Sequence, residues 1–277
     1  MRYLWKIDDG DKIRLKDFDP DHIDDGVDHA FAEQESAKLS AELVELQELL
    51  AAAQHHSLLI ILQGMDTSGK DGTIRHVLSP VNPQGCHVVS FKEPTQEELL
   101  HDFLWRVHKE TPGRGIIGVF NRSHYEDVLI ARVHNLVPEQ VWSKRYEQIN
   151  HFESLLASNN TIILKFFLHI SFDEQTSRLL AREQDRDKAW KLSASDWTER
   201  RYWDDYQHAY EDAITRCSAK DAPWFIVPAN HKWYRNLAVL HTIVHAIRDY
   251  RDEWKTDLQA RGAKELELLK TMRAAQK

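Results

Sequence analysis

A glycine-rich segment between an apolar stretch and a helical stretch constrains the fold of this chain most. Residues 57–63 are almost wholly apolar, and they run directly into Gly64-Met-Asp-Thr-Ser-Gly-Lys-Asp-Gly; residues 73–78 then have helical spacing. The spacing of Gly64, Gly69 and Lys70 is that of a phosphate-binding loop, in which backbone N–H groups surround a phosphate and the lysine reaches its oxygens. A glycine turn with a solvated lysine would match the same letters, but the strand before it and the helix after it favour the phosphate-binding loop.

Strand-like and helix-like segments alternate along the rest of the chain. The further segments that resemble strands are 86–91, 115–120, 161–168 and 223–228. The segments with helical spacing are 31–53, 95–107, 138–157, 196–214 and 236–250, with further helices starting near Ser123 and Ser171. Capping-box spacing supports helix starts at Thr95 and Ser123. This alternation predicts an α/β fold with a parallel five-stranded sheet flanked by helices, and ligands at the carboxyl ends of the strands.

No linker rich in glycine, serine or proline divides the chain, so we predict a single domain over residues 1–277. Residues 1–54 would form an extended arm followed by a helix, because residues 1–30 lack a sustained period. Residues 178–200 would form a lid, and residues 257–277 a helical tail.

Composition and charge exclude several classes of protein. A content of 42% hydrophobic and 29% charged residues is typical of a folded domain, and the net charge of −8 argues against a nucleic-acid or anionic-lipid surface. No apolar run approaches the ~20 residues of a membrane span, and the first residues lack the apolar core of a secretory signal. We therefore expect a cytoplasmic protein, with Cys86 and Cys217 as packing residues. The helix at 31–53 and the number of tryptophans favour a homodimer or homotetramer.

Acidic residues near the loop are candidate metal ligands. Asp71 stands where a serine or threonine usually binds Mg²⁺ in such loops, so Asp66 within the loop is the predicted donor, with a turn-stabilising role as the alternative. Asn121 is the first polar residue after the strand at 115–120, where such proteins usually carry an acid. Glu126 or Asp127 would supply the missing carboxylate, although both also suit the first turn of a helix. Mg²⁺ is the expected cofactor, with Mn²⁺ as a substitute.

Cationic residues follow two of the strands. Arg122 is predicted to face the loop and contact phosphate, with a structural carboxylate as its alternative partner. The segment from Arg178 to Lys191 carries five basic and three acidic side chains, and Arg178, Arg182 and Arg186 share one helix face. Such a face is often only solvated, but after the fourth strand of a phosphate-binding domain it indicates a lid that closes over the transferred phosphate.

Four ordered blocks resemble the polyphosphate kinases of the second type, close to the short single-domain members. The blocks are Gly64-Met-Asp-Thr-Ser-Gly-Lys-Asp-Gly, Asn121-Arg-Ser-His-Tyr-Glu-Asp, the stretch from Arg182 to Asp196, and Ala222-Pro-Trp-Phe-Ile-Val-Pro-Ala-Asn. They span roughly residues 55 to 245, and some members of the family carry aspartate where this chain has Asn121.

The resemblance implies a thymidylate-kinase-like P-loop fold with a helical lid. It also implies Mg²⁺-dependent transfer of a terminal phosphoryl group between inorganic polyphosphate and AMP or ADP, with guanine nucleotides as possible acceptors. The expected catalytic residues are Asp66, Lys70, Arg122 and Arg182. The expected phosphate-binding residues are Gly64, Thr67, Ser68, Gly69, Lys70, Asp71, Gly72, Arg178, Arg186, Lys188 and Lys191. Asn121, Tyr125, Glu126 and Asp127 are expected at the nucleotide, and Asp66 and Asn121 at the metal.

Two alternatives remain open from the sequence. An ATP-dependent nucleotide kinase of the same fold would use the same loop and the same basic residues. A module that binds nucleotide or polyphosphate without turnover would keep the loop but transfer nothing.

Overall fold

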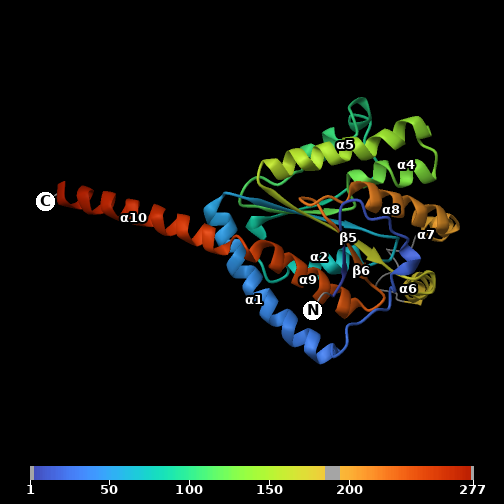
Figure 1. Ribbon diagram of the computed structural model, residues 1–277, viewed down its shortest axis with the longest axis horizontal. Coiled ribbons are helices and arrows are strands. Elements are labelled where there is room, and N and C mark those ends of the chain that lie inside the picture. Colours follow the sequence, from blue (N-terminus) through green and yellow to red (C-terminus); the bar gives the residue numbers. More distant parts are fainter. Residues whose placement is uncertain (1–2, 185–193, 276–277) are drawn as a thin grey trace.

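A six-stranded sheet forms the centre of the molecule in the computed structural model, which describes residues 3–184 and 194–275 (Figure 1). The strand order across the sheet is β1-β6-β5-β2-β4-β3. The strands are β1 (Trp5–Ile7), β2 (Ser57–Gln63), β3 (Cys86–Ser90), β4 (Ile117–Asn121), β5 (Thr161–His169) and β6 (Trp224–Pro228). Strands β2 to β6 are parallel, which confirms the α/β fold class and the five predicted strands.

Strand β2 lies at the centre of the sheet and is buried along its whole length. Ile60 pairs with Val119 of β4 on one side and with Leu164 of β5 on the other. After β2 the chain forms β3 and β4 on one side of it and then β5 and β6 on the other, so the strand order reverses at β2. The crevice beyond the carboxyl end of β2 is therefore the expected ligand position in a sheet of this kind.

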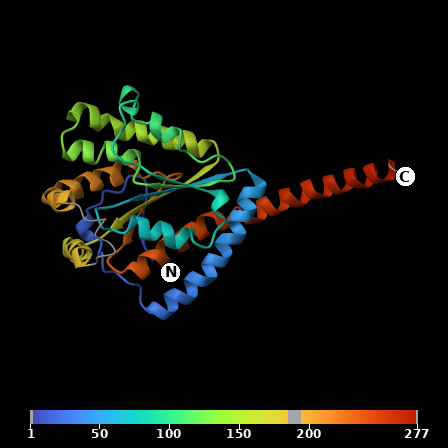
Figure 2. The ribbon, with the colours of Figure 1, turned by 180° about the vertical axis from the view of Figure 1, so that it is seen from behind.

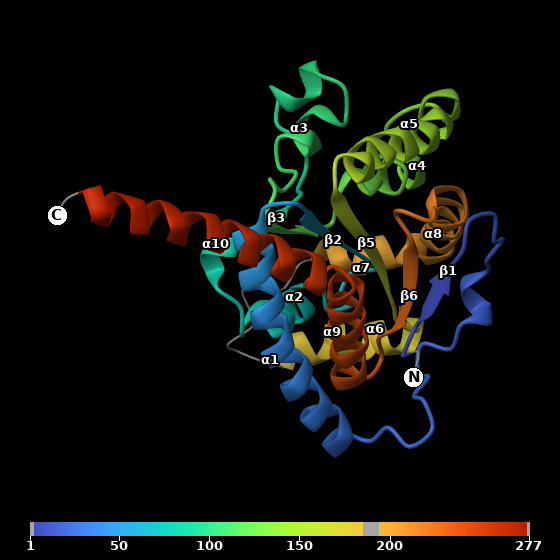
Figure 3. The ribbon, with the colours of Figure 1, turned by 60° about the vertical axis from the view of Figure 1, so that its left-hand side comes forward.

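Helices cover both faces of the sheet (Figure 1). Helices α1, α2 and α9 lie on one face, and α4, α5 and α8 lie on the other (Figure 3). Helices α6 and α7 lie together at one end of the sheet (Figure 1). The bounds are α1 (His29–Ala53), α2 (Lys70–Leu78), α3 (Trp105–His108), α4 (Ile130–Val133), α5 (Glu139–Ser158), α6 (Phe172–Gln184), α7 (Ala194–Glu199), α8 (Trp203–Cys217), α9 (Lys232–Arg248) and α10 (Arg251–Ala275).

The prediction of a sheet with five strands was incomplete at its edge. Part of the N-terminal arm forms β1, which pairs antiparallel with β6 through Trp5 and Ile226. Ser218 fixes this edge because its hydroxyl donates to the carbonyl of Ile7 and accepts the N–H of Trp224. A strand of three residues has no readable alternation, so its sequence resembled irregular chain.

Two predicted helices are much shorter in the structure. The capping box at Thr95 forms, with Thr95 N–H donating to Glu98 and Glu98 N–H donating to Thr95, but it is followed only by the 3₁₀ turn η3 (Glu98–Leu100) and the four-residue α3. The side chain of Asp102 accepts the N–H of Leu104 and so interrupts the helix. After Ser123 the chain forms the 3₁₀ turn η4 (His124–Asp127) before α4.

Helix α10 follows α9 closely and projects from the body (Figures 1 and 2). Its first turns are anchored by Trp254, which is fully buried and donates to His56. Its distal half exposes apolar side chains, namely Leu266, Leu268, Leu269 and Met272. Within residues 3–184 and 194–275, no helix is long and apolar enough to cross a bilayer.

Candidate active site

The loop between β2 and α2 adopts a conformation that requires glycine at two positions. Gly64 has a φ of 150°, and a Cβ added there would lie 2.8 Å from the carbonyl oxygen of Leu168. Gly69 has a φ of 102° and directly precedes α2, and a Cβ there would lie 1.9 Å from a guanidinium nitrogen of Arg235. A side chain at Gly64 would therefore collide with backbone, and one at Gly69 would strain the loop and push the Arg235 guanidinium aside.

Side chains outside the loop bind its carbonyl groups. Gln175 donates to Asp66 O at 3.1 Å, and Arg178 donates to Thr67 O at 2.9 Å and to Ser68 O at 3.0 Å. Among the described residues, the N–H groups of Asp66, Thr67 and Gly69 donate to no carbonyl. The buried hydroxyls of Thr67 and Ser68 also have no hydrogen-bond partner there. A loop whose carbonyl groups are bound by outside side chains, and whose N–H and O–H donors are unengaged, has the arrangement of an anion-binding nest.

Lys70, the first residue of α2, folds back over the loop. Its ammonium donates to Gly64 O at 2.7 Å and to Met65 O at 3.3 Å. Burial and, to a lesser degree, the charge of Arg122 lower the pKa of Lys70 to about 8, against the opposing effect of Asp66. A phosphate in the loop would favour the charged form, because an anion close to an ammonium stabilises its proton.

Arg122 and Asp66 form an ion pair above the loop. Arg122 directly follows β4 with a φ of 61°, and its N–H donates to Leu62 O at 3.0 Å. Its guanidinium lies 2.8 Å from Asp66 Oδ1 and 3.9 Å from Glu126 Oε2. Burial alone would lower the pKa of Arg122, but Glu126 and Asp66 raise it above its usual range. Arg122 thus stays charged beside the loop.

Asn121, at the end of β4, contacts the loop from the same side. Its amide donates to Asp71 Oδ1 at 2.7 Å. This contact ties the end of β4 to the first turn of α2 and leaves the Asn121 carbonyl oxygen available as a neutral ligand. In the part of the chain that the structure describes, no three histidine, cysteine or acidic side chains are grouped closely enough to hold a metal ion on their own.

A cavity of about 250 Å³ opens beside these residues. Its lining residues are Gly64, Met65, Asp66, Arg122, Glu126, Ile130, Gln175, Asp196, Glu199, Tyr206 and Tyr210. The loop, the end of β4, and helices α6, α7 and α8 all contribute to its walls. Burial raises the pKa of Asp196, and the nearby charge of Asp66 raises it further. Tyr206 donates to Glu199 at 3.0 Å.

Arg182 reaches this cavity through its ion pair with Asp196, at 3.1 Å. Arg178, four residues earlier, was predicted to bind phosphate from the lid. In the structure it is buried behind the loop, where its donors contact Glu174, Ala229 O and Asn230 O as well as the loop carbonyls. Arg178 therefore supports the loop from behind, and its side chain is not on the surface of a lid.

Two residues expected at the nucleotide lie elsewhere. Tyr125 is fully buried in the core, where its hydroxyl donates to Glu153 at 2.9 Å. Asp127 accepts from Arg145 at 3.2 Å and lies 3.9 Å from Arg106, so it belongs to a separate cluster. The structure does not support a nucleotide contact for either residue. Arg186, Lys188 and Lys191 lie outside the described residues.

Several residues at the site were not predicted from the sequence. They are Gln175, Asp196, Glu199, Tyr206, Tyr210 and Arg235. All are contributed by helices that follow β5 or β6, and on those helices they looked like ordinary members of an amphipathic pattern. The spacing of Tyr206 and Tyr210, one helical turn apart on α8, was the only readable signal, because it places two hydroxyls on one face of the helix.

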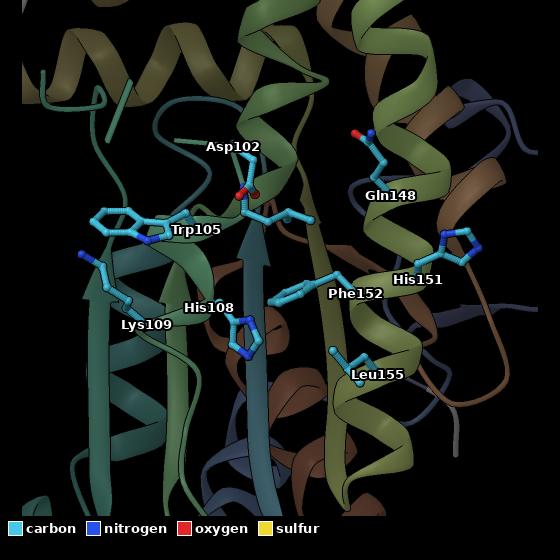
Figure 4. A pocket seen from close by; sticks show the side chains of 9 residues that line it. Asp102, Trp105, His108, Lys109, Gln148, His151, Phe152 and Leu155 are labelled. Atoms are coloured by element: carbon cyan, nitrogen blue, oxygen red, sulfur yellow. The ribbon is translucent and has the colours of Figure 1, made fainter. Parts of the chain in front are cut away.

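A larger hollow, of about 740 Å³, lies between α3 and α5, away from the loop (Figure 4). Phe152 of α5 points across it toward His108, with ring centroids 5.5 Å apart (Figure 4). The ammonium of Lys109 lies 3.5 Å from the centroid of the Trp105 ring. None of the loop residues lines this hollow, so it offers no anion-binding nest for phosphoryl transfer.

Comparison with known proteins identifies the family. The sequence model of the polyphosphate kinase 2 (PPK2) family matches residues 26–255. The chain belongs to the polyphosphate kinase 2 family. The AMP/ADP-polyphosphate phosphotransferase of Meiothermus ruber is 50% identical over 245 residues, which are 88% of this chain and 91% of that protein. The ADP-polyphosphate phosphotransferase of Rhodopseudomonas palustris is 43% identical over 95% of this chain and 96% of that protein.

Solved PPK2 structures share the fold as well as the sequence. The crystal structure of polyphosphate kinase 2 from Arthrobacter aurescens superposes with a TM-score of 0.85 at 44% identity, covering 87% of each chain. The resemblance stated from the four sequence blocks is therefore confirmed at the level of family and fold. In this PPK2 member Lys70 folds back onto the loop, and Arg122 forms an ion pair with Asp66 of the same loop.

Proposed function

We propose that this PPK2 protein transfers a terminal phosphoryl group between inorganic polyphosphate and AMP or ADP. The observation that carries the proposal is the nest of unengaged loop donors beside Lys70 and Arg122. This nest suits a phosphate, but its described donors do not distinguish a nucleotide from polyphosphate. The names of the relatives from Meiothermus ruber and Rhodopseudomonas palustris supply the substrate class.

The cavity beside the loop is the proposed nucleotide site. Glu199 and the hydroxyls of Tyr206 and Tyr210 line this cavity, and they are donors and acceptors suited to a ribose or a base. Arg122 lines the same cavity and contacts Asp66 of the loop. We therefore place the acceptor phosphate next to Arg122 and the nucleoside toward α8. The proposal names adenine nucleotides, with guanine nucleotides to be tested beside them.

The residues present fit a magnesium ion that retains water ligands. Mg²⁺ is usually held by one or two carboxylates together with the phosphates of the substrate, so a ready-made cluster of three acids is not required. Asp66 and Asn121 would hold the ion. Glu126 would supply the further carboxylate, since Asp127 is engaged by Arg145 and Arg106. When bound, Mg²⁺ neutralises charge on the transferring phosphoryl group.

The chain's own residues then account for the transfer. Phosphoryl transfer passes through a loose transition state, so positioning and charge neutralisation matter more than covalent chemistry. Lys70 and the loop N–H groups hold the terminal phosphate of polyphosphate, and Arg122 exchanges its contact with Asp66 for the phosphate oxygens. The acceptor oxygen attacks the terminal phosphorus in line, and the shortened polyphosphate leaves. Arg182, released from Asp196, would add charge as the lid closes.

The remaining expectations are proposals too. We propose a cytoplasmic protein that forms a homodimer or homotetramer. The exposed leucines of α10 support the assembly, because large apolar side chains in one patch commonly mark a contact between subunits. Magnesium dependence and the closing motion of the lid belong to the same proposal.

Incubation of the purified chain with AMP, long-chain polyphosphate and Mg²⁺, in the absence of ATP, tests the function. We expect ADP and then ATP to form, while the Lys70→Ala variant forms neither at a comparable rate. Product that appears only when ATP is supplied would indicate an ATP-dependent nucleotide kinase instead. Binding without turnover would indicate a non-catalytic module.

A further inference from the structure

Arg235, on the second turn of α9, is a buried cation without a countercharge. It is 3% exposed, and no carboxylate of the described chain lies within ion-pair distance of it. Its guanidinium donates to Ser68 O at 3.1 Å and to the side-chain oxygen of Asn236 at 2.8 and 3.1 Å. All of these acceptors are neutral.

The other buried cations of the described chain behave differently. Arg106 lies 3.7 Å from Glu98, Arg178 lies 2.6 Å from Glu174, and Lys165 contacts Glu153. Burying a charge is costly unless it is paired, which explains these partners. Burial and, to a lesser degree, the charge of Arg178 lower the pKa of Arg235 to about 9. An unpaired guanidinium at this depth therefore destabilises the ligand-free protein.

The position of Arg235 shows where a countercharge would come from. Its guanidinium packs against Gly69 so closely that a Cβ on that residue would lie 1.9 Å away. Gly69 precedes the N-terminus of α2, which carries partial positive charge, and Lys70 follows it. The guanidinium of Arg235, the N-terminus of α2 and the ammonium of Lys70 thus all lie against the loop, and the unpartnered hydroxyls of Thr67 and Ser68 belong to the same loop.

We propose that Arg235 is a positioning residue of the phosphate-binding loop whose charge is balanced by the polyphosphate anion that the loop binds. It holds the Ser68 carbonyl from behind, which keeps the neighbouring N–H groups free for phosphate. Its charge acts through the loop backbone at low dielectric, where electrostatic attraction is stronger than in water. The inference rests on the proposed function and identifies the side of the loop that sets affinity for polyphosphate.

Binding of inorganic tripolyphosphate, measured by titration calorimetry, tests the inference together with steady-state kinetics. We expect Arg235→Gln to weaken tripolyphosphate binding at least tenfold and to raise the KM for polyphosphate similarly, with the KM for AMP changed less than twofold. Arg235→Lys, which keeps the charge, should recover most of the affinity. Arg248→Gln removes a charge from the same helix, where it is paired with Glu42, and should leave both constants within twofold.

Stability without ligand separates this role from a merely structural one. Burying an unpaired guanidinium costs free energy, and Arg235→Gln removes that charge. In phosphate-free buffer the urea midpoint of the variant should therefore stay close to that of the wild type. A variant that unfolds, or that binds tripolyphosphate as well as the wild type, would overturn the inference. If the wild type itself neither binds tripolyphosphate nor converts AMP, the proposed function fails, and this inference fails with it.

Discussion

The guanidinium of Arg122 lies 2.8 Å from the carboxylate of Asp66, directly above the phosphate-binding loop. A predicted phosphate clamp and a predicted metal ligand therefore neutralise each other in the ligand-free protein. In the proposed reaction, polyphosphate and Mg²⁺ would separate the pair, because each brings the opposite charge to one partner. This exchange would link the binding of the two ligands, so that each one prepares the site for the other.

Asp66→Asn tests the carboxylate in this exchange. The amide keeps the shape of the side chain but removes the charge that would hold Mg²⁺, so we expect kcat to fall at least ~10²-fold. Steady-state assays with AMP and polyphosphate measure the loss, and circular dichroism checks the fold. Asp173→Asn makes the same charge change at an exposed position on α6 and should keep wild-type kcat. Turnover of Asp66→Asn near the wild-type rate would remove Asp66 from the metal site.

The pH dependence of polyphosphate binding reports on Lys70. Its pKa of about 8 means that it is charged below pH 8 and becomes neutral as the pH rises through 8. Because the bound anion favours the charged form, tripolyphosphate should bind with constant affinity below pH 8 and weaken by up to about tenfold per pH unit above it. Calorimetry from pH 7 to 8.5 measures this, below the pKa of about 9 of Arg235. Over this range Lys70→Arg, which stays charged, should give a flat profile, and a flat wild-type profile would contradict the assignment.

The buried pair of Glu153 and Lys165 connects α5 with β5 beneath η4. Burial alone would raise the pKa of Glu153, but Lys165 and His124 lower it below its usual range. Glu153→Gln leaves the Lys165 ammonium buried without its partner, so we expect a loss of about 3–5 kcal/mol in the free energy of unfolding. Urea denaturation measures it. The double variant with Lys165→Met should lose less than the sum of the two single variants, and strict additivity would show that the pair does not interact.

Removal of residues 264–277 tests the proposed assembly. This deletion takes away Leu266, Leu268, Leu269 and Met272 but keeps Arg261, which donates to the Ala52 carbonyl. If α10 contacts a second subunit, light scattering should show a lower solution mass for the truncated chain, with its activity per chain within twofold of full length. Replacement of the four apolar residues by glutamine in the full-length chain is the matched control. An unchanged mass in both variants would place the subunit contact elsewhere.

The central part of the fold could be predicted because its signals are local. The apolar run of β2, the glycines of the loop and the start of α2 are contiguous, and Lys70 follows from their spacing. Asp66 and Arg122 were predicted at the site for the same reason, since each lies at or beside the carboxyl end of a central strand. Their mutual contact follows from β2 and β4 being neighbours in the sheet.

The features that were missed depend on contacts between distant segments. Arg235 reaches Ser68 across 167 positions in the sequence, and nothing in its own helix distinguishes it from a surface arginine. Arg178 was predicted to bind phosphate from the lid, and only packing shows that it lies behind the loop and binds its carbonyl groups. The helix predicted over 95–107 ended early because Asp102 competes for a backbone N–H, a choice that periodicity does not reveal.

The pairing of β1 with β6 has a consequence for how the chain is made. Trp5 and Ile226 are partners about 220 positions apart. At the usual translation rate of about 5–20 residues per second, roughly 10–40 s pass between the synthesis of Trp5 and that of Ile226. Strands β2 to β5 have time to assemble in this interval, and β1, the first strand to be made, joins the sheet only after β6.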